Sequence, residues 1–251
     1  MIPHSPTIED FDHFLRRFQH LASSLERLRI GDFKSSFCRV SAGIQSLQNL
    51  GIEMERVSSP RFNIFSLLGV ERLEVGTHSA ILVDLLDPQG THGQGDLFLK
   101  NFFQIYVLGD LDYATGQNWI IEKEKVTSWG NLDVVLSESA QKRCVVIENK
   151  IDAMDQPGQL ARYYRWIQEG SPYSLKKSRL IYLTIGGFHP TASSFQIDGI
   201  RDIEIKEIRD KLILMSWKTD IRKWLRESLG EVQASGVRET LRQYLKIIEG
   251  L

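Results

Sequence analysis

A change of hydrophobic period in the middle of the chain constrains the fold more than any other feature. Apolar residues recur at helical spacing in the first hundred residues, but three short apolar runs follow at 119–126, 132–136 and 144–148. Runs of this length, separated by turn residues such as Gly130 and Asn131, are typical of β-strands. The third run is the most apolar, which predicts a central place in a sheet. Two more strands are expected at 180–185 and 212–215.

Helical patterns flank these strands. Helices are predicted at 78–86, 98–106, 157–168, 217–225 and 237–248. Pro157 is expected as the first residue of the third helix, because its ring fixes a φ angle that suits a helix start. Strands and helices that mix in this order predict an α/β core, which we assign to residues 60–251.

Residues 1–59 are predicted to form a separate helical extension. One apolar stripe runs from Phe11 to Leu28 and a second from Phe33 to Leu47, with Gly31 between them. Because glycine commonly ends a helix, we interpret the two stripes as an antiparallel helical hairpin. Packing is the ordinary role of such stripes. Dimerisation or gripping of a substrate is the alternative.

Composition bounds the function only loosely. A net charge of −1 argues against a polycation that coats nucleic acid, although a local basic patch is enough to bind phosphates. Cys38 and Cys144 lack the spacing of a metal site, so we expect two reduced thiols in a cytoplasmic protein. The segment after Met1 does not resemble a signal peptide, and no apolar run has the length that spans a membrane. No membrane partner is therefore expected.

Three polar residues interrupt or follow the central apolar runs. Asp133 lies inside the second run, Glu148 ends the third, and Lys150 shares the face of Glu148 if the strand continues. Carboxylates at such positions lose hydration unless something compensates for their charge. A divalent cation between Asp133 and Glu148 would do so, and oxygen ligands without His or Cys favour Mg²⁺ or Mn²⁺. An ordinary ion pair between Asp133 and Lys150 is the alternative.

These three residues belong to an ordered set of motifs over residues 60–230. The motifs are Leu132-Asp133, Ile147-Glu148-Asn149-Lys150 and Gln156, Gln159, Leu160 and Tyr163, with His78-Ser79, Leu85 to Pro88 and His92 to Gly95 upstream, and Leu180 to Thr184, Ser216-Trp217 and Trp224-Leu225 downstream. In this set the sequence resembles the PD-(D/E)xK nuclease superfamily, and more narrowly a bacterial branch of it. The N-terminal extension lies outside the resemblance. The resemblance implies a restriction-endonuclease-like mixed central sheet flanked by helices.

The resemblance also implies roles for the motif residues. Asp133 and Glu148 would bind the metal, Mg²⁺ with Mn²⁺ as a substitute, together with the backbone carbonyl of Asn149. Lys150 would be the catalytic lysine. Leu132 stands where the family name has proline, a departure that is common in this diverse superfamily.

Five further residues have weaker assignments. Glu74 precedes the first core helix, where many members have a glutamate that reaches the metal, although a surface acid there is also common. A glutamine such as Gln159 lies beside the site in related nucleases, and a tyrosine such as Tyr163, on the same helix face, contacts substrate. Core packing of Tyr163 is an equal alternative. His78 and His92 lack the partners of a zinc site, so we expect them at a helix start and in a glycine-rich loop, as candidate substrate contacts.

The sequence therefore predicts a magnesium-dependent nuclease that acts on nucleic acid, with DNA as the first choice and restriction or phage defence as the setting. A protein that keeps the fold but only binds nucleic acid or a partner is the alternative. The intact set of Asp133, Glu148 and Lys150 argues against it. Since one such site cuts one strand, we expect a homodimer for double-strand cutting, formed through the N-terminal extension. The choice between DNA and RNA, and between ends and interiors, stays open, because fold alone does not fix function.

Overall fold

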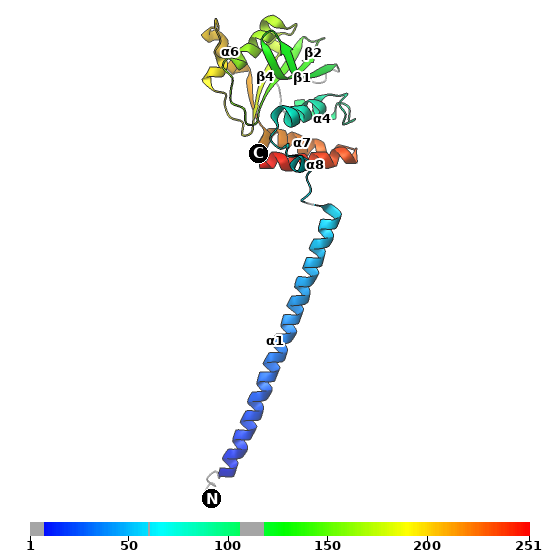
Figure 1. Cartoon of the computed structure of the whole chain (residues 1–251), viewed down its shortest axis with the longest axis vertical. Coiled ribbons are helices and arrows are strands. Elements are labelled where there is room, and N and C mark those ends of the chain that lie inside the picture. Colours follow the sequence, from blue (N-terminus) through cyan, green and yellow to red (C-terminus); the bar gives the residue numbers. More distant parts are fainter. Residues whose placement is uncertain (1–7, 60, 106–117) are drawn as a thin grey trace. The chain divides into compact units, whose positions relative to one another are not determined.

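The computed structural model describes residues 8–59, 61–105 and 118–251. The chain divides into two units, Met1–Phe62 and Asn63–Leu251. The second unit contains the sheet and all the candidate site residues (Figure 1). Tyr106, the expected last residue of the second predicted helix, lies outside the described residues.

Five strands form one mixed sheet in the order β1-β2-β3-β4-β5. They are β1 Trp119–Thr127, β2 Gly130–Glu138, β3 Arg143–Lys150, β4 Arg179–Thr184 and β5 Leu212–Ser216. The first three are antiparallel neighbours, whereas β4 runs parallel to β3 and β5 parallel to β4. Every residue of β3 is buried, as expected of the most apolar run. The five predicted strands are confirmed.

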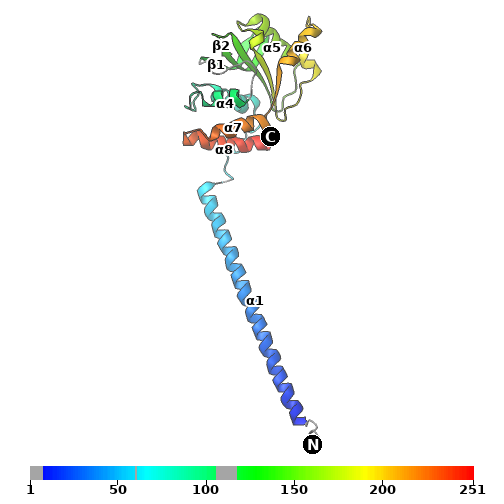
Figure 2. The ribbon, with the colours of Figure 1, turned by 180° about the vertical axis from the view of Figure 1, so that it is seen from behind.

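The sheet separates two hydrophobic cores, because side chains alternate between its faces. On one face Val145 and Ile147 pack with α3 Ala80–Leu86, α4 Leu97–Ile105, α7 Arg222–Leu229 and α8 Ser235–Gly250. On the other face Val135 and Val146 pack with α5 Gln159–Arg165 and α6 Asp202–Lys211. Figures 1 and 2 show α4, α7 and α8 on one side of the sheet and α5 and α6 on the other. The predicted α/β class, a mixed central sheet flanked by helices, is confirmed.

Short helical segments complete this unit. They are α2 Ile64–Leu68, η1 Glu74–Ser79, η3 Trp166–Gly170, η4 Leu175–Lys177, η5 Ala192–Phe195 and η6 Trp217–Ile221. Helix α5 begins at Gln159, so the prediction of Pro157 as first helical residue is wrong. Gly158 stands between them with a left-handed φ of 68°, a conformation that breaks the helical path.

The N-terminal extension contains one long helix and no hairpin. Helix α1 Ile8–Ser58 has 51 residues and passes without a break through Gly31 and Gly51. The hairpin prediction is wrong because a glycine inside a helix costs only about 1 kcal/mol relative to alanine, which long flanking segments offset. Both apolar stripes are exposed, as Phe18 and Phe37 show. Within the described part of the chain, no helix combines the length and apolar composition needed to cross a bilayer.

Candidate active site

The candidate site lies where β2 and β3 stop pairing. Their antiparallel ladder ends with Val134 opposite Ile147, and the next residues on the two strands are Asp133 and Glu148. Here the backbone N–H of Asn149 donates to Oδ2 of Asp133 at 2.9 Å, so a carboxylate takes the place of a ladder carbonyl. The register of the sheet thus brings the two predicted metal ligands next to each other.

Lys150 joins the same side of β3 as Glu148. Its Nζ lies 2.6 Å from Oε1 of Glu148, and both side chains are buried. Residues two apart on a strand share a face, which explains the contact. Lys150 therefore pairs with Glu148, not with Asp133 as in the alternative ion pair considered from the sequence.

Burial and crowding shift the protonation of these groups. Burial raises the pKa of Asp133 to about 8, and the nearby charge of Glu148 adds to the effect, although the Asn149 N–H opposes it. Burial also raises the pKa of Glu148, and the charge of Lys150 offsets only part of this. For Lys150, burial is the largest single effect and lowers the pKa, but the charge and hydrogen bond of Glu148, together with the charges of Asp133 and Glu74, make the net shift upward. The lysine is therefore a charged ammonium at neutral pH. Its single positive charge is not enough to bring the pKa values of the two neighbouring carboxyl groups back to their ordinary range.

Helix α5 supplies a polar contact to the second carboxylate. The Tyr163 hydroxyl donates to Oε2 of Glu148 at 2.5 Å and lies 2.9 Å from the carbonyl oxygen of Asn131. Gln159, one turn earlier, donates from Nε2 to the same hydroxyl at 3.3 Å. Tyr163 and Gln159 are both buried. Tyr163 thus holds the Glu148 carboxylate, and Gln159 is connected to the site through the Tyr163 hydroxyl. A contact of Tyr163 with substrate stays a prediction.

Glu74 reaches the end of β3. Its Oε2 accepts the backbone N–H of Ile151 at 2.6 Å, so it braces the peptide that follows Lys150. Among the described residues, no three or more His, Cys, Asp or Glu side chains lie together as a ready cluster of metal ligands. The register of the sheet brings together the carboxyl groups of Asp133 and Glu148. A contact of Glu74 with a metal ion stays a prediction.

The two histidines are held inside the fold. His78 Nδ1 lies 2.8 Å from the Tyr244 hydroxyl, and its Nε2 lies 2.8 Å from the Glu71 carbonyl oxygen. Burial lowers the pKa of His78, so the ring is neutral near pH 7. His92 accepts the Gln94 N–H at one ring nitrogen and contacts the Asp87 carbonyl at the other. Both rings thus make structural contacts, and a contact of either with substrate stays a prediction.

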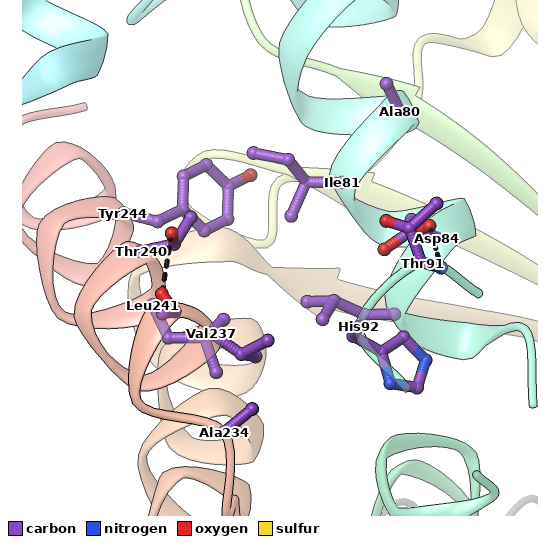
Figure 3. Close-up of a pocket in the computed structure, with 12 residues that line it drawn as sticks. Ala80, Ile81, Asp84, Thr91, His92, Ala234, Val237, Thr240, Leu241 and Tyr244 are labelled. Atoms are coloured by element: carbon purple, nitrogen blue, oxygen red, sulfur yellow. Dashed lines mark hydrogen bonds between the residues drawn. The ribbon is translucent and has the colours of Figure 1, made fainter. Parts of the chain in front are cut away.

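A separate cavity of about 710 Å³ lies between α3 and α8. In Figure 3, Ile81, Asp84 and His92 border one side of it, and Val237 and Tyr244 border the other. Its lining is mostly apolar and includes neither Asp133, Glu148 nor Lys150. Glu148 and Lys150 share the face of the sheet that carries α5, whereas this cavity is built by helices of the opposite face.

Sequence reasoning missed the contacts of the Asn149 side chain. Its Nδ2 donates to Oγ of Ser79 at 3.0 Å, and its Oδ1 accepts the indole N–H of Trp217 at 2.9 Å. Trp217 is 1% exposed. No periodicity identifies a hydrogen bond between residues so distant in the chain, although all three belong to the motifs quoted above.

A family model described as the PD-(D/E)XK nuclease superfamily matches residues 62–246. That span contains all of the site residues described above. No curated protein and no solved structure gives a significant match.

Proposed function

Because the chain belongs to the PD-(D/E)XK nuclease superfamily, we propose that it hydrolyses phosphodiester bonds in nucleic acid, with DNA as the main substrate. The observation that carries the proposal is the pair of neighbouring carboxyl groups on Asp133 and Glu148, with the ammonium of Lys150 at 2.6 Å from the second. The three groups lie where the pairing of β2 with β3 ends. They combine acidic oxygens with one positive charge, as attack on a phosphodiester requires.

We infer that the site takes a divalent cation, Mg²⁺ first and Mn²⁺ as a substitute. Asp133, Glu148 and the backbone carbonyl of Asn149 would hold it, an all-oxygen set that suits a hard cation. Two features of the site fit a cation. The pKa values of both carboxyl groups are raised, and in the described part of the chain Oε1 of Glu148 is buried without an aligned hydrogen-bond donor, its contact being the ion pair with Lys150. When bound, such an ion supplies Lewis acidity toward the phosphate and makes water a better nucleophile.

The remaining residues have roles that follow from their contacts. Lys150, charged at neutral pH, would stabilise the negative charge that develops on the phosphate in the transition state. Tyr163 fixes the orientation of the Glu148 carboxylate through Oε2, and Gln159 holds the Tyr163 hydroxyl. Glu74 keeps the end of β3 in place through the Ile151 N–H.

Cleavage assays test the proposed activity directly. Plasmid, linear duplex DNA and RNA are incubated with the protein under Mg²⁺, Mn²⁺ or EDTA. We expect cleavage of DNA that EDTA abolishes and that both Asp133→Ala and Lys150→Ala lose. Asp152→Ala is the matched control, because this exposed carboxylate pairs with Arg72 on the surface. A protein that binds DNA but cuts none of the substrates would instead be a binding module on the same fold.

Calorimetric titration with Mn²⁺ tests the metal site separately from cleavage. Wild type should show a binding site that Asp133→Ala loses and Asp152→Ala keeps. Equal binding by wild type and Asp133→Ala would remove Asp133 from the metal site.

We propose that the active form is a homodimer joined through residues 1–59, while residues 60–251 carry the nuclease site. Helix α1 supports this because its apolar side chains are exposed along two stripes, far more apolar surface than an isolated helix keeps in water. Light scattering should report a dimer that Leu47→Asp weakens and the neighbouring Gln48→Asp leaves intact. A monomer at all concentrations, with full double-strand cutting, would contradict the proposal.

We further propose restriction or phage defence in the cytoplasm as the biological setting. The two free thiols, Cys38 and Cys144, support a reducing compartment. Plating phage on bacteria that express wild type or Lys150→Ala tests the setting. Equal phage titres on both strains would contradict a defence role without bearing on the nuclease activity itself.

A further inference from the structure

The side-chain amide of Asn149 makes two hydrogen bonds on the face of β3 opposite Glu148 and Lys150. We call these bonds, with their partners Trp217 and Ser79, the clamp. Glu148 contacts Tyr163 on the α5 face of the sheet, and Lys150 pairs with Glu148 there. Asn149, between them, points to the opposite face and is fully buried. There its oxygen accepts the Trp217 indole N–H at 2.9 Å, and its nitrogen donates to Ser79 Oγ at 3.0 Å.

The clamp holds β3 just beyond the point where its backbone pairing with β2 ends. The β2–β3 ladder ends at Ile147, and beyond it the Asn149 backbone N–H donates to the Asp133 carboxylate at 2.9 Å. On the other side β3 stays paired with β4 through Lys150. Without ladder bonds to β2 the Asn149 peptide is held less firmly on that side, and its two side-chain hydrogen bonds oppose a rotation about the strand axis.

Trp217 is itself rigidly placed. It is the first residue of η6, directly after β5, and Ser216 Oγ donates to the Ile185 carbonyl at 2.9 Å. The Trp217 ring packs against His78, with ring centroids 5.0 Å apart. Ser79, the second partner, follows His78 at the end of η1. The clamp therefore joins β3 to two separate elements of the fold.

We propose that Trp217 and Ser79 are positioning residues, which hold the Asn149 peptide so that its N–H meets Asp133 and its carbonyl faces the metal site. The inference deepens the proposed function and rests on it for the metal; the part that concerns the Asn149 N–H stands on the fold alone. Neither residue contacts substrate, and both act through Asn149.

The chain offers a matched control for each half of the clamp. Trp224 is also fully buried and donates its indole N–H at 2.9 Å, but to the carbonyl of Phe98. Ser228 is buried and accepts from an asparagine Nδ2, that of Asn101, at 3.3 Å. Trp217→Phe is therefore compared with Trp224→Phe, and Ser79→Ala with Ser228→Ala. Each pair removes the same kind of bond from the same kind of environment.

Hydrogen exchange of the Asn149 backbone amide, followed by NMR without metal, is the first measurement. We expect exchange about tenfold faster in Trp217→Phe and Ser79→Ala than in their controls, because the peptide opens more often once its anchor is lost. Equal exchange within both pairs would overturn the proposal. If Trp217→Phe fails to fold, the smaller change Ser79→Ala carries the comparison.

Mn²⁺ affinity and single-turnover cleavage are the second and third measurements. The clamp variants should bind Mn²⁺ about three- to tenfold more weakly than their controls and cut about tenfold more slowly, with DNA affinity unchanged. An unchanged Mn²⁺ affinity beside faster amide exchange would refute the link from the clamp to the metal site. Wild-type protein that binds no Mn²⁺ would instead refute the proposed function, and the exchange data would still decide whether the clamp holds the peptide.

Discussion

Replacing Asp133 with asparagine should make the metal-free protein less sensitive to rising pH. Burial and the charge of Glu148 raise the pKa of Asp133 from 3.8 to about 8. At a pH between those two values, this carboxyl is protonated in the folded chain but ionised in the unfolded chain. The free energy of unfolding therefore falls as pH rises through the interval, and the fall stops above about pH 8.

The size of the effect follows from the width of that interval. Within it, each pH unit costs about 1.4 kcal/mol of stability. Between about pH 6 and about pH 9, wild type should lose about 2–3 kcal/mol from this group, since the loss saturates near the folded-state pKa. Asparagine has no proton to lose, and its Oδ1 can still accept the Asn149 N–H. Over the same pH interval, the stability of Asp133→Asn should therefore fall by about 2–3 kcal/mol less than that of wild type.

Urea unfolding in EDTA at the two pH values measures the difference. Comparing the change with pH, not the stabilities themselves, cancels any constant cost of the substitution. Asp152→Asn is the control: its hydrogen bond with Arg72 lowers the pKa of Asp152, so it is ionised in both states over this range. Mn²⁺ should restore the stability of wild type at the higher pH but not that of Asp133→Asn. Parallel pH curves for wild type and Asp133→Asn would refute the reasoning.

Three further predictions concern the chemistry of single side chains. Lys150→Ala should bind Mn²⁺ within about threefold of wild type but cut at least about a hundredfold more slowly, and a near-wild-type rate would exclude Lys150 from the mechanism. Gln159→Ala should lower single-turnover cleavage by about one to two powers of ten with metal binding unchanged, whereas a change within about twofold would mean that Gln159 only supports the helix. Cys38 is exposed and should react with a thiol reagent in the native state, while Cys144, whose pKa burial raises to about 12, should react only after unfolding; equal native rates would show that β3 opens readily.

The fold was predictable wherever burial dictates the residue type. All five strands follow from apolar runs bounded by turns, because a strand covered on both faces, as β3 is, tolerates few polar residues. Helix α6 has no counterpart among the predicted helices, since Ile203 and Ile205 lie at strand spacing. The predicted break at Gly31 was wrong for a different reason. Glycine weakens a helix without ending it, and the flanking segments decide whether the helix continues.

The candidate site was predictable where the backbone alone positions the groups. Strand alternation is enough to put Glu148 and Lys150 on one face. The pairing of β2 with β3 adds Asp133. The contacts of Asn149 with Trp217 were not predictable, because an indole N–H and an amide far apart in the chain leave no pattern when their bond forms. Such bonds depend on tertiary packing, and a buried tryptophan satisfies its N–H with whatever acceptor the fold supplies.

The hairpin between β2 and β3 also decides how freely the motif can vary in length. Glu138 and Arg143 close its base with a buried ion pair at 3.2 Å, and residues 139–142 beyond it are exposed. Extra residues in that turn would lengthen a surface loop and leave Asp133 next to Glu148. A single residue inserted within β2 would turn the next side chain to the other face and separate the two acids. The number of residues between the acids is thus a property of the loop, and it carries no information about the chemistry at the strand ends.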